Sequence, residues 1–232
     1  MKSIYLIIIF LLNVSSVMAA DQPESICYGT TEKGRIENAW QLPSAGKNFS
    51  VYSSLGAMVG RNYVHSKVYT IVLDAYKSLL QKEPNKVFVY GETGWKNGGR
   101  FRPHKTHQNG LSVDFFVPVL DNSKGTSVPL PTSALNKFGY DIEFTSKGTD
   151  KEYSIDFESM AAHLFALKEA ADKNGVTISK IIFDNDLQKL LFNTSKGKEL
   201  QALLPFSTNK PWVRHDEHYH VDFSVPCKDI LY

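Results

Sequence analysis

Three stretches of the chain carry apolar residues at the spacing of an amphipathic helix. Residues 68–79 have this pattern behind Ser66, which we predict to be the N-cap. Residues 157–171 repeat it behind Asp156, a second candidate N-cap, and a shorter run covers 187–191. Each helix would turn its apolar stripe toward a common core.

Four other runs have the composition or alternation of β-strands, namely residues 86–90, 111–119, 178–183 and 218–223. In the second run the apolar residues alternate with Ser112 and Asp114, so those two side chains share the opposite face. Pro118 has no N–H to donate, and we therefore expect this strand to lie at an edge there or to end early.

The order of these elements bears on the fold class. Helices and strands interleave, but several strands alternate as half-exposed strands do, which favours antiparallel pairing over a doubly wound parallel sheet. No long linker or internal repeat divides the sequence. We predict a single α+β domain, residues 21–232, with a mainly antiparallel central sheet and flanking helices.

The first residues have the pattern of an export signal. One early positive charge precedes a short apolar block, residues 4–12, and small residues lead to Ala19 and Ala20. We predict a signal peptide over residues 1–20. The apolar block is too short to span a bilayer, so we expect no membrane span after its removal; a retained N-terminal anchor is the alternative.

The chain has two cysteines, Cys27 and Cys227, near the two ends of the predicted mature protein. An exported protein meets oxidising conditions, which favours a disulfide between them, with two buried free thiols as the alternative. A bond that closes so long a loop stabilises by roughly 4 to 5 kcal/mol in the chain-entropy model.

Charge gives little guidance to partners. The 26 Lys and Arg residues nearly balance the 24 Asp and Glu residues, so we expect no nucleic-acid partner. The sequence leaves the oligomeric state open.

Five of the seven histidines lie in two short clusters, and the first cluster ends in an aspartate. The members are His104, His107 and Asp114 in one cluster and His215, His218 and His220 in the other. A lone histidine is usually structural, but two clusters with ligand-like spacing favour a metal site.

Zinc is the metal that this residue set suits. It binds imidazole and carboxylate, and a catalytic zinc site takes three protein ligands and leaves the fourth position for water. His107 can approach from a loop and Asp114 from the polar face of its strand. His218 and His220 point the same way on a strand, so one can bind zinc while the other transfers a proton. A purely structural zinc site is the alternative.

At these residues the sequence resembles the penicillin-insensitive murein endopeptidases, within the larger group of zinc peptidases that includes lysostaphin and the D-alanyl-D-alanine carboxypeptidases. His104, His107 and Asp114 reproduce the first motif of that family, and the second cluster reproduces its late His-x-x-His-x-His. The glycine-rich residues 91–101 resemble the approach to the first motif, with Glu92 where an aspartate is expected.

The resemblance implies one zinc ion bound by His107, Asp114 and His220. It implies that His218 acts as the base, with His215 and His104 as auxiliary proton-handling groups. Glu217 is the second candidate base, although strand alternation would turn it away from the metal.

The expected substrate is the stem peptide of peptidoglycan, in the periplasm. Arg100, Arg102 and Arg214 flank the two motifs, and their guanidinium groups suit the free carboxylates of stem peptides. We expect hydrolysis of D-alanyl-diaminopimelate cross-links. The alternatives are a D,D-dipeptidase or carboxypeptidase on the same site, and a non-catalytic zinc-containing cell-wall binding module.

Overall fold

The computed structural model describes residues 22–209 and 213–230. The predicted signal peptide, residues 1–20, lies outside this part of the chain and stays a prediction. Among the described residues, no helix is long and apolar enough to cross a membrane.

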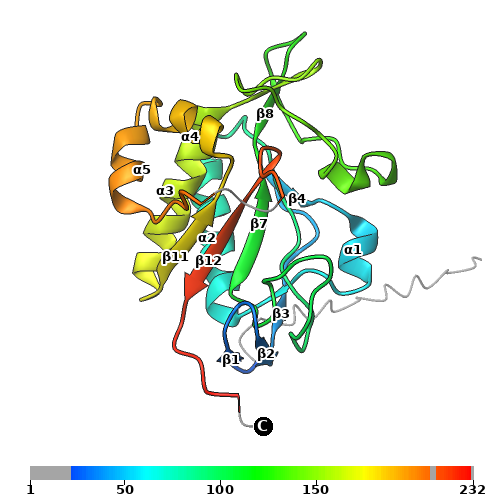
Figure 1. Cartoon of the computed structure of the whole chain (residues 1–232), viewed down its shortest axis with the longest axis vertical. Helices are drawn as coiled ribbons and strands as arrows, with labels where there is room; N and C mark the ends of the chain where they lie inside the picture. Colours follow the sequence, from blue (N-terminus) through cyan, green and yellow to red (C-terminus); the bar gives the residue numbers. More distant parts are fainter. Residues whose placement is uncertain (1–21, 210–212, 231–232) are drawn as a thin grey trace, which may run out of the picture.

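A five-stranded sheet in the order β11-β12-β7-β6-β4 forms the centre of the molecule (Figure 1). Its strands are β4 (Phe49–Val51), β6 (Phe88–Tyr90), β7 (Ser112–Phe116), β11 (Thr177–Ile182) and β12 (His218–Ser224). Neighbouring strands are antiparallel except β4 and β6, which are parallel. The prediction of an α+β fold with a mainly antiparallel central sheet is confirmed.

Two long helices, α2 (Ser66–Lys82) and α3 (Phe157–Lys173), pack against each other and cover one face of this sheet (Figure 1). His163 of α3 lies between this helix and the sheet, where its ring contacts Phe115 of β7 and Tyr219 of β12. Phe115 and Tyr219 therefore face the helices, and the side chains that alternate with them, among them Asp114, His218 and His220, face the opposite side.

Shorter elements surround this central unit. They are β1 (Ile26–Gly29), β2 (Gly34–Glu37), β3 (Trp40–Gln41), α1 (Ser54–Met58), β5 (Tyr63–Val64), β8 (Val119–Asp121), β9 (Ser127–Val128), η2 (Ala134–Gly139), β10 (Tyr153–Ile155), α4 (Asn185–Phe192) and α5 (Gly197–Leu203). Strands β1 and β2 pair, as do β3 and β5, and β10, β8 and β9 form a separate small sheet.

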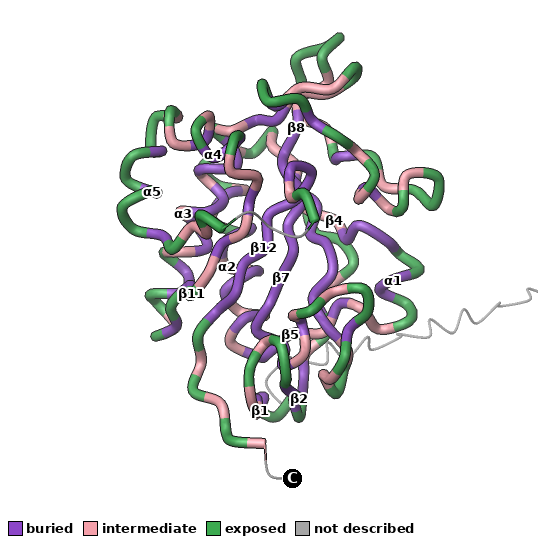
Figure 2. The backbone as a smooth tube through the Cα atoms, viewed as in Figure 1, coloured by how far each residue is buried: buried purple, intermediate pink, exposed green. Residues whose placement is uncertain are grey.

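Most buried apolar side chains of the described residues belong to one connected cluster, which does not include Ile36, Ala39 and Phe101. Figure 2 shows β7 and β12 buried along nearly their whole length. Polar side chains on these strands are thus held in a rigid, largely dry setting, which is a favourable place for a site that needs fixed geometry.

One local prediction needs correction, and another is confirmed in one of its two forms. The N-cap of α2 is His65, whose Nδ1 accepts the Lys67 N–H at 3.1 Å, because an imidazole nitrogen can take the place of a hydroxyl there. Ser66 instead accepts the N–H of Ser25 with its hydroxyl. The predicted strand 111–119 ends at Phe116, as Pro118 requires, and β7 is a central strand and not an edge.

Cys27 and Cys227 form a disulfide. The bond links the start of the β1–β2 hairpin to the segment after β12, across a sequence separation of 200 residues. The predicted pairing of the two cysteines is therefore confirmed, and it ties the ends of the described chain together.

Candidate metal centre

The site begins with the pairing of β7 and β12, which places Asp114 directly opposite His220. Both side chains lie on the sheet face away from α3, and Oδ1 of Asp114 is 2.8 Å from Nδ1 of His220. Behind His220, Oδ1 of Asp222 lies 2.9 Å from Nε2 of the same ring and accepts the Ser112 hydroxyl at 2.6 Å. The His220 ring is thus held from both sides.

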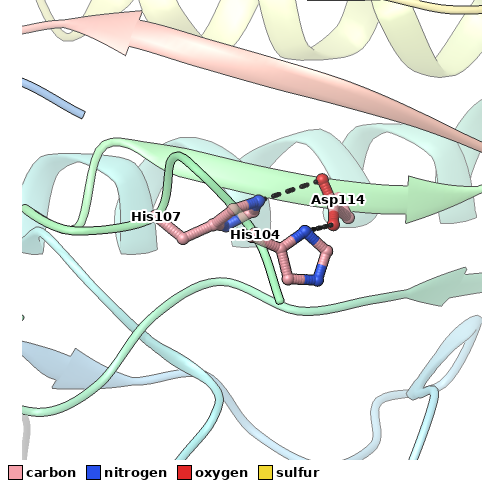
Figure 3. A group of neighbouring side chains, drawn as sticks. All are labelled: His104, His107 and Asp114. Atoms are coloured by element: carbon pink, nitrogen blue, oxygen red, sulfur yellow. Dashed lines mark ion pairs between the residues drawn. The ribbon is translucent and has the colours of Figure 1, made fainter. Parts of the chain in front are cut away.

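His107 reaches the same carboxylate from the loop before β7. Its φ of 66° is uncommon for a residue with a side chain, and such backbone occurs preferentially at functional sites. Nδ1 of the ring lies 3.0 Å from the carbonyl oxygen of Thr93, and Nε2 lies 3.3 Å from Oδ1 of Asp114. Figure 3 shows His107 and His104 pointing at the two oxygens of Asp114.

The donor set fits a zinc ion. Nε2 of His107 is fully buried and has no hydrogen-bond partner, which is costly unless a ligand satisfies it. Its other nitrogen meets a carbonyl, and the far nitrogen of His220 meets a carboxylate. Metal-binding histidines characteristically have such an acceptor behind the ring, because it fixes the tautomer that presents a lone pair to the metal.

His104 is a further candidate donor. Ligand atoms of His104, His107 and Asp114 all lie within 4.8 Å of one another. Nδ1 of His104 is 3.9 Å from Oδ2 of Asp114, whereas both His107 and His220 approach Oδ1. The four side chains therefore form one group around a single carboxylate.

The charges in this group suit a cation. Burial alone raises the pKa of Asp114, but its contacts with His107 and His220 outweigh burial, so the pKa lies well below 3.8. Burial lowers the pKa of His107. Burial lowers the pKa of His220 too, but Asp222 and Asp114 outweigh burial and raise it to about 10. Asp114 and His107 are therefore in the forms that bind zinc, whereas a metal ion would have to displace a proton from His220.

Glu92 is buried beside His104, and the sequence did not indicate its partners. Its carboxylate is 6% exposed and accepts hydrogen bonds from the Tyr52 hydroxyl at 2.7 Å and from Arg61. Nε2 of His104 lies 2.5 Å from Glu92 Oε2. Burial raises the pKa of Glu92, but hydrogen bonds from His104, Arg61 and Tyr52 overcome this and hold the pKa at about 2.

The second histidine cluster consists of His215, His218 and His220. It lines a cavity beside the candidate metal ligands. His218 and His220 both line it, as their alternation on β12 predicts, and the ring centroids of His215 and His218 are 4.5 Å apart. Nδ1 of His215 lies 2.7 Å from the carbonyl oxygen of Val213. Nδ1 of His218 lies 2.9 Å from Oε1 of Glu217, which is also buried.

Tyr140, from the turn after η2, is a second residue that sequence reasoning missed. Its hydroxyl accepts the Glu92 N–H at 3.4 Å and lies 3.4 Å from Oδ2 of Asp114. Burial, with the charges of Asp114 and Glu92, raises its pKa well above 10, so the hydroxyl keeps its proton. No motif in the sequence marks this position.

A cavity of about 720 Å³ opens over these groups. Its cationic lining residues are Arg61, Lys105, Lys137 and Lys180, and its apolar lining residues include Leu55, Val59, Phe138 and Ile182. This volume is ample for a peptide segment.

The three predicted substrate-binding arginines are not among the described residues that line this cavity. Arg100 and Arg102 are exposed near the first motif. Arg214 is paired within the protein, since it contacts Glu143 at 2.7 Å, Asp184 at 3.3 Å and Asp216 at 3.3 Å. Binding of stem-peptide carboxylates by these arginines stays a prediction.

The chain was compared with known protein families. The model of a family described as penicillin-insensitive murein endopeptidase matches residues 27–230. No curated protein matches the chain.

Proposed function

This chain belongs to the penicillin-insensitive murein endopeptidase family, and on that basis we propose that it uses one zinc ion to hydrolyse D-alanyl-diaminopimelate cross-links of peptidoglycan. The family is a family of peptidases that act on murein. The metal, its ligands and the bond that is cut are the parts that we propose.

The proposed zinc ligands are Nε2 of His107, Oδ1 of Asp114 and Nδ1 of His220. The observation that carries the assignment is the buried and unpartnered Nε2 of His107, 3.3 Å from a carboxylate oxygen that His220 also contacts. His104 is the weaker ligand candidate because Nε2 of its ring is engaged by Glu92 and Nδ1 lies 3.9 Å from the other oxygen. We assign it an auxiliary role in proton handling.

When bound there, zinc supplies Lewis acidity toward the scissile carbonyl and lowers the pKa of a water molecule toward neutrality. Side chains of the protein carry out the proton transfers. His218 lines the cavity next to His220 and takes the proton of the attacking water, then gives it to the leaving amine. Oε1 of Glu217 lies 2.9 Å from Nδ1 of His218, and when Nδ1 carries the proton Nε2 of that ring is the free acceptor. His215, whose ring centroid lies 4.5 Å from that of His218, assists this transfer.

The substrate fits the charge of the cavity. Stem peptides carry free carboxylates, and the cavity lining includes four cationic side chains: Arg61, Lys105, Lys137 and Lys180. Two of these also pair within the protein, Arg61 with Glu92 and Lys137 with Asp141. Arg100 and Arg102 are exposed near the first motif, and we retain them as candidate carboxylate-binding residues. We propose that the protein is located in the periplasm. The disulfide and the predicted signal peptide support this location.

Digestion of defined muropeptides tests the proposal. The purified chain from residue 21 onward is incubated with a cross-linked dimer and with a monomer that ends in D-Ala-D-Ala, and the products are identified by mass. Conversion of dimer to monomers supports the endopeptidase. Loss of a terminal D-alanine from the monomer identifies a carboxypeptidase instead, and zinc binding without any product identifies a binding module. His218→Ala, which retains the proposed ligands, is expected to bind zinc and release no product.

A further inference from the structure

We propose that Tyr140 is a positioning residue of the metal centre, which holds Oδ2 of Asp114 so that Oδ1 is left for the metal. This inference rests on the proposed zinc site and deepens it. It concerns a residue outside both histidine clusters, in a segment of the chain where the sequence carries no recognisable motif.

The backbone around Asp114 is fixed on both sides. The Gly91 N–H donates to the Asp114 carbonyl at 2.7 Å, and the Asp114 N–H donates to the Glu92 carbonyl at 3.0 Å. The backbone alone does not set the rotation of the carboxylate, which needs a contact of its own. Oδ1 meets His107 and His220, and Oδ2 lies 3.4 Å from the Tyr140 hydroxyl.

The Tyr140 hydroxyl is itself held in place. It accepts the Glu92 N–H at 3.4 Å, so its own proton is directed elsewhere, and Oδ2 of Asp114 is the acceptor within reach. Both contacts are long for hydrogen bonds, and contacts in active sites often tighten once the ligand is bound. The hydroxyl thus joins the Glu92 backbone to the side chain of Asp114.

Four rings hold the tyrosine ring in the cavity wall. Its centroid lies 5.1 Å from Phe116, 5.1 Å from His218, 6.1 Å from Tyr52 and 6.2 Å from His104. Tyr140 therefore packs against both the proposed base and the auxiliary histidine while its hydroxyl reaches the proposed ligand.

Gly91 is the feature of the chain that makes room for this contact. A Cβ at Gly91 would lie 3.0 Å from the Tyr140 hydroxyl and 3.0 Å from Cβ of Asp114. Both distances are tighter than ordinary van der Waals contact, so a side chain here would press Tyr140 and Asp114 apart. The glycine is needed for the close approach of these two residues, which is independent support for their contact.

A hydrogen bond to the second oxygen of a ligand carboxylate fixes its orientation, and loss of such partners typically weakens metal binding by 10–100-fold. The experiment is a chelator-competition titration that measures the zinc Kd of the wild type, Tyr140→Phe and the control Tyr153→Phe. Tyr153 lies in β10, and its variant makes the same chemical change outside the cavity lining. Thermal unfolding of each zinc-free protein is measured in parallel.

We expect Tyr140→Phe to raise the zinc Kd by about tenfold or more with an unchanged zinc-free Tm, and Tyr153→Phe to change neither. Gly91→Ala, which keeps the hydroxyl but displaces it, is expected to weaken zinc binding in the same direction. A Kd within twofold of the wild type for Tyr140→Phe would overturn the inference, as would a loss of zinc affinity matched by a drop in zinc-free Tm. If the wild type itself binds no zinc, the proposed function fails with it, which is a different result from equal binding by both proteins.

Discussion

Oε1 of Glu217 lies 2.9 Å from Nδ1 of His218, and both side chains are almost completely buried. Strand alternation would turn Glu217 away from the site, but β12 begins at His218, so the rule does not extend to the residue before it. The contact gives Glu217 a role as the group that orients the proposed base, instead of being the base itself.

Replacement of this carboxylate is expected to slow the reaction without removing the metal. Burial raises the pKa of Glu217 to about 8, so the ionised form, which selects the His218 tautomer with a proton on Nδ1, predominates above that pH. In Glu217→Gln the side chain keeps its size but cannot ionise, and the assay is therefore run at pH 9. We expect kcat to fall by roughly 10–100-fold, with the zinc content unchanged, because general-base catalysis contributes about 10²–10⁴-fold. Steady-state kinetics on a cross-linked muropeptide, with zinc analysis of the same sample, measures both quantities.

Glu143→Gln is the matched control. Glu143 is exposed and pairs with Arg214 at 2.7 Å, so its substitution removes a carboxylate from the same region of the protein. We expect its kcat to equal that of the wild type. Equal kcat values for Glu217→Gln and Glu143→Gln would contradict the orienting role.

Arg214 is expected to contribute more to stability than to substrate affinity. Asp216 is completely buried and its carboxylate lies 3.3 Å from Arg214, so Arg214→Ala leaves that acid without its cation. We expect the free energy of unfolding to fall by about 1–3 kcal/mol. Urea denaturation measures this change, and Arg102→Ala, at an exposed position near the first motif, is expected to leave the stability unchanged and raise KM. A rise in KM for Arg214→Ala with unchanged stability would restore it as a substrate-binding residue.

The Cys27–Cys227 disulfide is expected to stabilise the protein against unfolding. Its sequence separation of 200 residues means that it restricts nearly the whole unfolded chain. Reduction is expected to lower the free energy of unfolding by roughly 4 to 5 kcal/mol in the chain-entropy model. Urea midpoints with and without reductant test this, and the double variant Cys27→Ser/Cys227→Ser is expected to be indifferent to the reductant. A wild type that unfolds at the same midpoint in both conditions would contradict the prediction.

Low pH is expected to destabilise the N-terminus of α3, because the N-cap residue Asp156 becomes protonated. Its carboxylate accepts the Ser159 N–H at 3.1 Å and pairs with Lys86 at 2.5 Å. Burial raises the pKa of Asp156, but the hydrogen bonds from Lys86 and Ser159 outweigh burial and hold it below 3.8. The folded chain therefore binds the Asp156 proton less readily than the unfolded chain. The stabilisation is complete above the unfolded pKa and is lost as the pH falls through the folded pKa.

Asp156→Asn isolates this effect because asparagine retains the capping oxygen but not the charge. We expect the variant to be less stable than the wild type by about 1 kcal/mol at pH 7, with a difference that shrinks as the pH falls below 3.8. Urea denaturation across this range measures the difference, and a gap that stays constant down to pH 2.5 would contradict the assignment.

The elements with strong periodicity were predictable from sequence. The apolar stripe of α3 and the alternation in β7 reflect burial against one core, which is a local property of the sequence. The order β11-β12-β7-β6-β4 depends on pairing between distant segments, and two-residue strands such as β3 and β5 exist only through their partner. Neither leaves a local pattern in the sequence.

The residues of the candidate site also fall into two groups, those that local sequence predicts and those that depend on tertiary contacts. The spacing of the histidines and Asp114 indicated the metal group, because chemistry requires those residue types at that spacing. Arg61 and Tyr140 escaped prediction because their roles arise from tertiary contact with Glu92 and Asp114, at positions with no motif. Residues that hydrogen-bond to a metal ligand are brought there by tertiary packing, so their spacing in the sequence does not reveal them.

Metal removal and return is the most direct test of a zinc-dependent endopeptidase. The purified protein is stripped with a chelator, dialysed, and assayed on a cross-linked muropeptide dimer as zinc is added back in measured equivalents, with His220→Ala in parallel. The account predicts that cleavage disappears on stripping, returns in the wild type as one zinc per chain is bound, and stays absent in His220→Ala. Undiminished cleavage by fully stripped protein would contradict it.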